Sequence, residues 1–201
     1  MVFARAPLAG RVKTRLAPRL GAAGAARLHA RLIRTAVRTA LGAHCGPVEL
    51  HATVRHRLFG TLNVRVRLQR GRDLGERMHH ALRGALRRHR TAILIGADCP
   101  SLTPADLRRA VRLLQGDADL VLAPAEDGGY ALIGARRVSP AVFASVEWGR
   151  PQVLAKTIEN MARARLKHRL LRTVWDVDRP EDLERLRARR FSLAAPRGAR
   201  R

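Results

Sequence analysis

A carboxylate at the end of a buried strand is the first feature of this sequence that could do chemistry. Residues 92–95, Ala-Ile-Leu-Ile, form a short apolar run, which predicts a strand buried on both faces. Gly96 and Pro100 end the run, and Asp98 lies between them. Ligands bind just beyond the carboxyl ends of strands in open α/β sheets, so Asp98 could hold a metal or face a phosphate. Alternatively, it only caps a turn before a helix that begins near Thr103.

A basic loop follows the expected first strand, Val2–Arg5. It carries Gly10, which lets a ligand approach the backbone closely, and the cations Lys13 and Arg15, which could bind a diphosphate or triphosphate. The GxxxxGK[ST] spacing of a P-loop is absent. A solvated basic turn explains the same composition nearly as well.

Two carboxylates and two glycines form a third candidate, Glu126-Asp127-Gly128-Gly129, followed directly by Tyr130. One interpretation is a hairpin turn in which the glycines supply positive φ angles. The other is a sterically open rim, with the two carboxylates facing ligand hydroxyls and Tyr130 lying against the ligand.

A pair of carboxylates, Asp176 and Asp178, comes last. Alternation along a strand would place both on one face, where they repel each other unless a cation neutralises them. Asp178 could also be only the cap of the helix that Pro180 begins.

The elements that must position these residues alternate between strands and helices. Apolar residues at Leu28, Leu32, Val37 and Leu41 predict one face of a helix over residues 21–42. Further helices are expected at 73–89, 104–115, 152–165 and 180–186, and further strands at 48–54, 64–68, 118–124 and 170–175. This order predicts one α/β domain, residues 1–190, with a mostly parallel, Rossmann-like sheet between layers of helices. Residues 191–201 are rich in Ala, Pro and Arg and predict a disordered basic tail.

The formal charge of +24 raises the question of a nucleic-acid partner. The basic residues are spread along the chain, and all but Lys13, Lys156 and Lys167 are arginines, as a GC-rich genome would produce. Aromatic residues, which stack on bases in many nucleic-acid modules, make up only 3%. We therefore expect weak polyanion binding but no specific nucleic-acid partner.

The sequence shows neither a membrane span nor a signal peptide, which bears on the cellular compartment we expect. No apolar run approaches the roughly 20 residues needed to cross a bilayer, and the start of the chain does not resemble a signal peptide. Cys45 and Cys99 have no metal-like spacing, and we expect them to stay reduced. A cytoplasmic protein is predicted.

Four segments together resemble a known family, and Trp175-Asp-Val-Asp178 fits its closing segment. They are Phe3-Ala-Arg-Ala-Pro-Leu-Ala-Gly-Arg-Val-Lys-Thr-Arg-Leu16, Asp73-Leu-Gly-Glu-Arg-Met78, Gly96-Ala-Asp-Cys-Pro-Ser-Leu-Thr103 and Pro124-Ala-Glu-Asp-Gly-Gly-Tyr130. The chain resembles the DUF2064 group of glycosyltransferase-like proteins, which accompany radical-SAM proteins of arsenosugar biosynthesis. That group is similar to the GT-A nucleotide-diphospho-sugar transferases, whose fold is a three-layer sandwich.

The resemblance implies a nucleotide site. Arg5, Gly10, Lys13 and Arg15 match the family's phosphate loop, and Asp98 matches the aspartate that binds a metal after the central strand.

The second carboxylate of such a metal site would be Asp176 or Asp178. These oxygen ligands suit Mg²⁺ or Mn²⁺. Asp127 would be the catalytic base or orient the acceptor, with Gly128, Gly129 and Tyr130 lining the sugar or acceptor pocket.

The resemblance thus implies a metal-dependent glycosyltransferase with a nucleoside-diphosphate sugar donor and a small-molecule acceptor. The alternative is a nucleotidyltransferase, which joins a nucleoside triphosphate to a phosphorylated acceptor and releases pyrophosphate. The molybdenum-cofactor and phospholactate guanylyltransferases share the broader fold. The sequence departs from the family pattern at Gly149-Arg150, which stands where Ser-Thr is expected after Trp148.

Overall fold

The computed structural model describes residues 1–188 of the chain. Its sheet has seven strands in the order β3-β2-β1-β4-β6-β5-β7. The strands are β1 (Val2–Ala4), β2 (Glu49–Ala52), β3 (Arg65–Leu68), β4 (Ala92–Gly96), β5 (Leu120–Pro124), β6 (Tyr130–Ala135) and β7 (His168–Leu170). Only β6 runs antiparallel to its neighbours, so the sheet is mostly parallel, as predicted.

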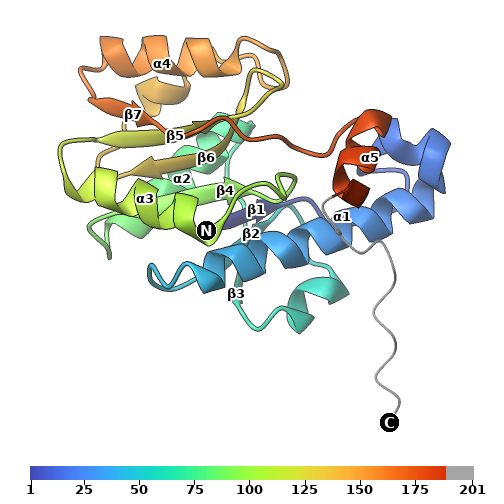
Figure 1. The fold of residues 1–201 in the computed structure, drawn as a ribbon. Coiled ribbons are helices and arrows are strands. Elements are labelled where there is room, and N and C mark those ends of the chain that lie inside the picture. The colour runs from blue at the N-terminus through green and yellow to red at the C-terminus, as the bar shows by residue number, and fades with distance from the viewer. Residues whose placement is uncertain (189–201) are drawn as a thin grey trace.

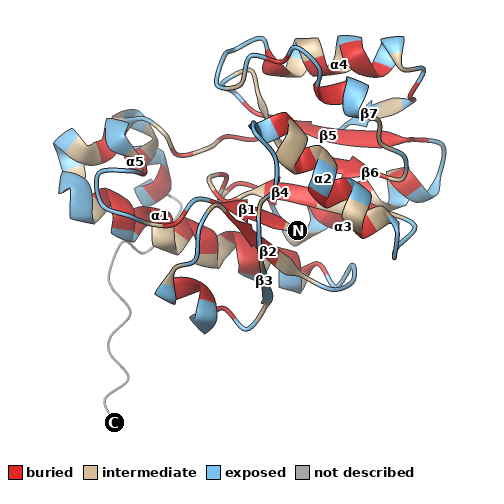
Figure 2. Ribbon diagram, turned by 180° about the vertical axis from the view of Figure 1, so that it is seen from behind, coloured by how far each residue is buried: buried red, intermediate tan, exposed pale blue. Residues whose placement is uncertain are grey.

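Helices cover both faces of this sheet and complete the predicted three layers (Figure 1). They are α1 (Ala17–Gly42), α2 (Leu74–Leu86), α3 (Pro104–Gln115) and α4 (Val153–Arg163), whereas α5 (Pro180–Ala188) packs against the first part of α1. Apolar residues of α1 and α3 pack on one face, while those of α2 and α4 pack on the other. Figure 2 shows the central strands as the most continuously buried part of the molecule.

The burial of β4 follows from its position in the middle of the sheet. Leu94 packs on the α2 side and Ile95 on the α1 side, and both are at most 4% exposed. An apolar run without alternation is what a strand covered on both faces requires. The buried strand predicted before Asp98 is therefore confirmed.

Capping residues set the starts of two helices, at or within one residue of the predicted positions. Thr103 and Asp106 form a reciprocal capping box at the start of α3, with Pro104 in its first turn. Asp73 caps α2 by accepting the backbone N–H of Glu76 at 2.8 Å. The Glu76 carboxylate accepts from Arg72 rather than from the Asp73 backbone, so an ion pair takes the place of the second half of a capping box.

Two predicted details are wrong. Leu41 is 43% exposed, because the buried stripe of α1 runs through Ala36, Val37 and Ala40 instead. The last strand ends at Leu170, not at Trp175, and continues only as an isolated bridge between Ala125 and Val174.

Connecting segments include short 3₁₀ turns at Thr14–Leu16, Arg57–Thr61 and Pro140–Phe143. Within residues 1–188, no helix is both long enough and apolar enough to cross a membrane. Cys45 and Cys99 are both free thiols. The expected tail, residues 191–201, lies outside the described residues.

Candidate functional site

The candidate residues meet because β1, β4 and β5 point the same way. β1 and β4 are parallel, and β6 is antiparallel to both β4 and β5. The carboxyl ends of these three strands therefore lie at one edge of the sheet, where α/β proteins bind ligands.

A pocket of about 280 Å³ opens at this edge. The ends of β4 and β5, the start of α2 and the segment before α4 all contribute to its wall. It is lined by Leu74, Met78, Gly96, Asp98, Cys99, Ala125, Asp127, Gly129, Tyr130, Ala131, Trp148, Gly149, Arg150, Val153 and Asp176.

Asp98 does not cap a turn. Its Oδ1 lies 3.0 Å from the Lys13 ammonium and 3.2 Å from His29 Nδ1. Oδ1 is shielded from solvent, yet 45% of the side chain is exposed, so the exposure lies on the side of the second oxygen. Burial would raise the pKa of Asp98, but His29 and Lys13 outweigh it and hold that pKa well below the ordinary range. The carboxylate is thus ionised, with one oxygen fixed and the other open to the pocket.

His29 is a site residue that the sequence analysis missed. It lies on the buried stripe of α1, is 3% exposed, and places Nε2 3.2 Å from the Arg5 carbonyl. Its ring therefore bridges the end of β1 and Asp98. The only sequence signal was a histidine beside the apolar position Leu28, which a core histidine explains equally well.

The predicted phosphate loop brings two cations to one place. Lys13 has a left-handed backbone, with φ of 49°, and its side chain is only 5% exposed. A non-glycine residue in this conformation is strained, and such strain is frequent at functional sites. The Lys13 ammonium lies between Asp98 and Asp178, 3.9 Å from the latter, and Arg15 forms an ion pair with Asp178 from the other side.

The other two loop residues, Arg5 and Gly10, contribute through their backbones. Arg5 is exposed, and its backbone carbonyl faces His29. Gly10 has φ of 75°, and a Cβ placed there would meet no atom within 4 Å. Gly10 therefore permits the turn and leaves open space beside it.

Asp176 and Asp178 lie in different surroundings. Asp178 does not cap α5 with its side chain; its backbone N–H instead donates to Asp182. Asp176 lines the pocket, where burial and the negative charge of Asp127 raise its pKa to about 6 although Lys13 acts in the opposite direction. The Val177 N–H donates to the Asp98 carbonyl at 3.0 Å and fixes this segment over the end of β4.

The segment between β5 and β6 is both a hairpin turn and a pocket rim. Gly128 has φ of 85°, and a Cβ there would lie 2.1 Å from the Pro151 carbonyl oxygen. Gly128 therefore packs against the Pro151 backbone and does not line the pocket as predicted. Asp127 accepts the Gly129 N–H at 2.9 Å and turns toward the pocket, and the Tyr130 ring meets Trp148 edge to face. Glu126 instead forms an ion pair with Arg185 of α5, outside the pocket.

No three His, Cys, Asp or Glu side chains within residues 1–188 are close enough together to hold a metal ion by themselves. The predicted set of Asp98, Asp176 and Asp178 is therefore not a preformed metal cluster. Lys13 lies between Asp98 and Asp178, whereas Asp98 and Asp176 line the same pocket.

Comparison with known proteins is decisive at the family level. Residues 27–150 match the family model DUF2064, described as uncharacterized proteins conserved in bacteria. The chain belongs to the DUF2064 family. A "putative nucleotide-diphospho-sugar transferase" from Desulfovibrio desulfuricans G20 is 32% identical, with a TM-score of 0.81 over 89% of this chain and 80% of that one. A search of curated protein sequences gave no match.

More distant structures share the fold of this DUF2064 protein. A CMP:2-keto-3-deoxy-manno-octonic acid synthetase complexed with CTP is 13% identical, with a TM-score of 0.61 over 94% of this chain and 96% of that one. A nucleotidyl transferase from Methanothermobacter is 16% identical, with a TM-score of 0.60 over 95% and 97%. The α/β fold predicted for the chain is thus confirmed.

Proposed function

We propose that this protein is a transferase that binds a nucleoside-diphosphate sugar with a divalent metal and transfers the sugar to a small acceptor. The observation that carries this is the state of Asp98. One of its oxygens is fixed by Lys13 and His29, and the side chain is half exposed beside a pocket that also holds Asp127 and Asp176. The relative from Desulfovibrio supports the choice of a nucleotide-diphospho-sugar.

The metal proposed here fits Asp98 and Asp176 better than the full predicted set. Mg²⁺ is often bound by one or two carboxylates together with substrate phosphates, so a protein cage of three ligands is not required. Burial and, to a lesser degree, the charge of Asp127 raise the pKa of Asp176, so its ionised form is disfavoured there and a bound cation would stabilise it. A metal bound there would offset the charge that develops on the leaving diphosphate.

Lys13 and Arg15 of the loop would bind the phosphates by giving up part of their present contacts with carboxylates. Lys13 and Arg15 now neutralise Asp98 and Asp178, and diphosphate oxygens are stronger competitors for Arg15, whose side chain is 68% exposed. Lys13 would hold the inner phosphate while it keeps Asp98 in place.

The remaining pocket residues would receive the sugar and the acceptor. Asp127 has one oxygen engaged by the Gly129 N–H, which orients the carboxylate to accept a proton from an acceptor hydroxyl. Leu74, Met78 and Trp148 form an apolar wall opposite the carboxylates, suited to one face of a ring. Arg150 adds a cation at the rim, in place of the hydroxyl residue that the family pattern has.

Nucleotidyl transfer is the second candidate. Lys13 and Arg15 converge on Asp178, and two adjacent cations suit a triphosphate as well as a diphosphate. In that reaction pyrophosphate leaves instead of a nucleoside diphosphate.

Ligand-dependent melting, followed by product analysis, tests the proposal. Nucleoside diphosphate sugars, diphosphates and triphosphates are each added with and without Mn²⁺, and the melting temperature is recorded. A diphosphate sugar that stabilises the protein only with metal supports glycosyl transfer and identifies the donor. A triphosphate response with pyrophosphate release moves the assignment to nucleotidyl transfer. The absence of any metal-dependent response would contradict both.

A further inference from the structure

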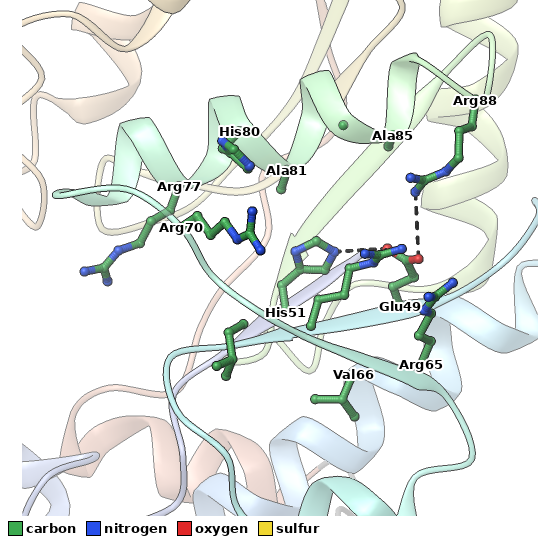
Figure 3. Close-up of a pocket in the computed structure, with 13 residues that line it drawn as sticks. Glu49, His51, Arg65, Val66, Arg70, Arg77, His80, Ala81, Ala85 and Arg88 are labelled. Atoms are coloured by element: carbon green, nitrogen blue, oxygen red, sulfur yellow. Dashed lines mark hydrogen bonds and ion pairs between the residues drawn. The ribbon is translucent and has the colours of Figure 1, made fainter.

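A second concave site lies away from the pocket at Asp98 and shares no lining residue with it. It has a volume of about 420 Å³, within the range of small-molecule sites. Its walls are the outer strands β2 and β3 on one side and the exposed flank of α2 on the other (Figure 3).

The hollow exists because α2 carries small residues where it faces these strands. Ala81, Gly84 and Ala85 line the pocket from the middle of the helix, and a Cβ on Gly84 would meet no atom within 4 Å. Arg77 and Arg88 stand at the two ends of the same stripe, one near each end of the helix. The stripe thus places cations around a floor of small side chains.

The facing strands add more cations on the same side of the sheet. Arg65 and Arg67 alternate on β3 and Arg70 follows it, so five arginines line the hollow among the described residues. Figure 3 shows the Arg70 and Arg88 side chains reaching from opposite sides into the space between α2 and the strands.

One carboxylate, Glu49, lines the hollow within residues 1–188, and it is already neutralised. Arg67 contacts it at 2.9 Å, His51 at 3.3 Å and Arg88 at 3.8 Å. Among the described residues, neither Arg65 nor Arg70 has an acidic partner. The lining of the hollow therefore carries more guanidinium groups than carboxylates, supplied by β3, by α2 and by the residues just after each of them.

We propose that this hollow binds a compact phosphorylated anion, such as an inorganic diphosphate or the phosphate groups of a small metabolite. Guanidinium groups bind phosphate oxygens through paired hydrogen bonds. The arginine-rich composition of the whole chain does not by itself mark a site. What marks this one is that five arginines line one concave surface, Arg70 and Arg88 reach into it, and its only carboxylate among residues 1–188 is satisfied. The small side chains of Ala81 and Ala85, with Gly84 between them, leave room there for the apolar body of a metabolite.

The test compares two double variants that remove the same charge. Arg65→Gln with Arg70→Gln removes the two unpaired cations of the hollow. Arg109→Gln with Arg112→Gln removes two exposed cations of α3 and is the matched control. Pyrophosphate and tripolyphosphate are titrated calorimetrically into each protein at fixed ionic strength, with a chelator present to exclude metals.

We expect the wild type and the α3 control to bind pyrophosphate alike, and the hollow variant to bind it at least about tenfold more weakly. Equal affinity in the two double variants would overturn the proposal, as would a wild type that does not bind. A short single-stranded RNA is titrated in parallel. If the hollow variant loses only RNA binding, the site is a nucleic-acid contact and the proposal is wrong.

The two proposals fail separately. Arg65 and Arg70 play no part in the donor site, so the hollow variant should keep the metal-dependent response to a nucleoside-diphosphate sugar. Circular dichroism of each variant confirms that the fold is intact.

Discussion

Asp98 and Asp176 line one pocket but have opposite electrostatic surroundings. Lys13 and His29 face Asp98 and hold its pKa below the ordinary range. Burial and the charge of Asp127 disfavour the ionised form of Asp176 and raise its pKa. Neighbouring carboxylates whose pKa values are pushed apart are a frequent property of functional sites.

Replacement of Asp98 by Asn tests its proposed contact with the metal. The variant keeps the shape of the side chain but leaves the buried Lys13 without its nearest counter-charge. We expect a loss of stability of about 1–3 kcal/mol. A saturating donor with Mn²⁺ adds ~2.7 kcal/mol at 100 times its dissociation constant, and this gain should vanish in the variant.

Melting curves with and without ligand measure both effects. Asp117→Asn, at an exposed carboxylate paired with Arg169, is the control and should keep the ligand response. An Asp98→Asn protein that retains the full metal-dependent response would refute the central role of Asp98.

Replacement of Asp176 by Asn tests the cost of ionising this buried carboxylate beside Asp127. The pKa of Asp176 is raised from 3.8 to about 6, so the folded protein binds the proton more tightly than the unfolded chain. The ionised carboxylate therefore destabilises the fold progressively as the pH rises from about 4 to 6, and fully above that. We expect Asp176→Asn to raise the melting temperature at pH 8 but not at pH 4 in metal-free buffer. A melting-temperature difference between variant and wild type that is constant with pH would show that neither burial nor Asp127 penalises the ionised carboxylate.

At the scale of elements, the turn between β5 and β6 is the least tolerant part of the site. Gly128 combines a positive φ with direct contact to the backbone at Pro151, which leads into α4. The Leu154 N–H also donates to the Gly128 carbonyl. The hairpin and the start of α4 are therefore fixed to each other, and Asp127 and Tyr130 are placed by that contact.

Gly128→Ala should be strongly destabilising. The left-handed backbone alone costs about 1–2 kcal/mol for alanine, and the backbone contact at 2.1 Å must be relieved in addition. We expect a total loss above ~3 kcal/mol, measured by chemical denaturation. Gly60→Ala, where a Cβ would meet no atom within 4 Å, is the control and should change stability by less than ~1 kcal/mol. Similar losses in both variants would contradict this account of the turn.

The elements also show how far the sequence could predict the site. Apolar runs, capping residues and turn glycines are local signals, so β4, the start of α3 and the turn at Gly128 were predicted. The contacts of Lys13 and His29 with Asp98 were not, because they join residues far apart in the chain. The many alanines of α1 hid its buried stripe, which is why Leu41 was misplaced and His29 overlooked.

The extent of the last strand was misjudged for a similar reason. Its apolar pattern was correct, but Arg172 forms an ion pair with Asp106 and donates to the Ser101 carbonyl. Leu171 and Val174 still donate to the Leu122 and Pro124 carbonyls, so the segment stays beside β5, but the contacts of Arg172 with α3 interrupt the regular strand pairing after Leu170. A pattern of single residues cannot reveal a contact with α3.

At the scale of the whole molecule, the charge of +24 gives the surface a general attraction for polyanions. Such binding depends on counterion release and is independent of sequence and metal. We expect short duplex DNA to bind in low salt and to be released by about 0.2 M NaCl, with no difference between unrelated sequences. Fluorescence anisotropy at several salt concentrations measures this. Binding that persists at high salt or prefers one sequence would reveal a nucleic-acid function that we do not expect.

The position of the segment from Arg172 to Asp178 bears on the synthesis and the proteolysis of the protein. It supplies Asp176 and Asp178, and the Val177 N–H reaches across to the Asp98 carbonyl. The site is thus built from the first loop, the end of β4 and the segment just before α5, the last described helix. During synthesis on the ribosome, the proposed site could not assemble until residues 172–178 had emerged. Proteolysis within this segment would remove the proposed ligands Asp176 and Asp178 without cutting any of the strands β1 to β7.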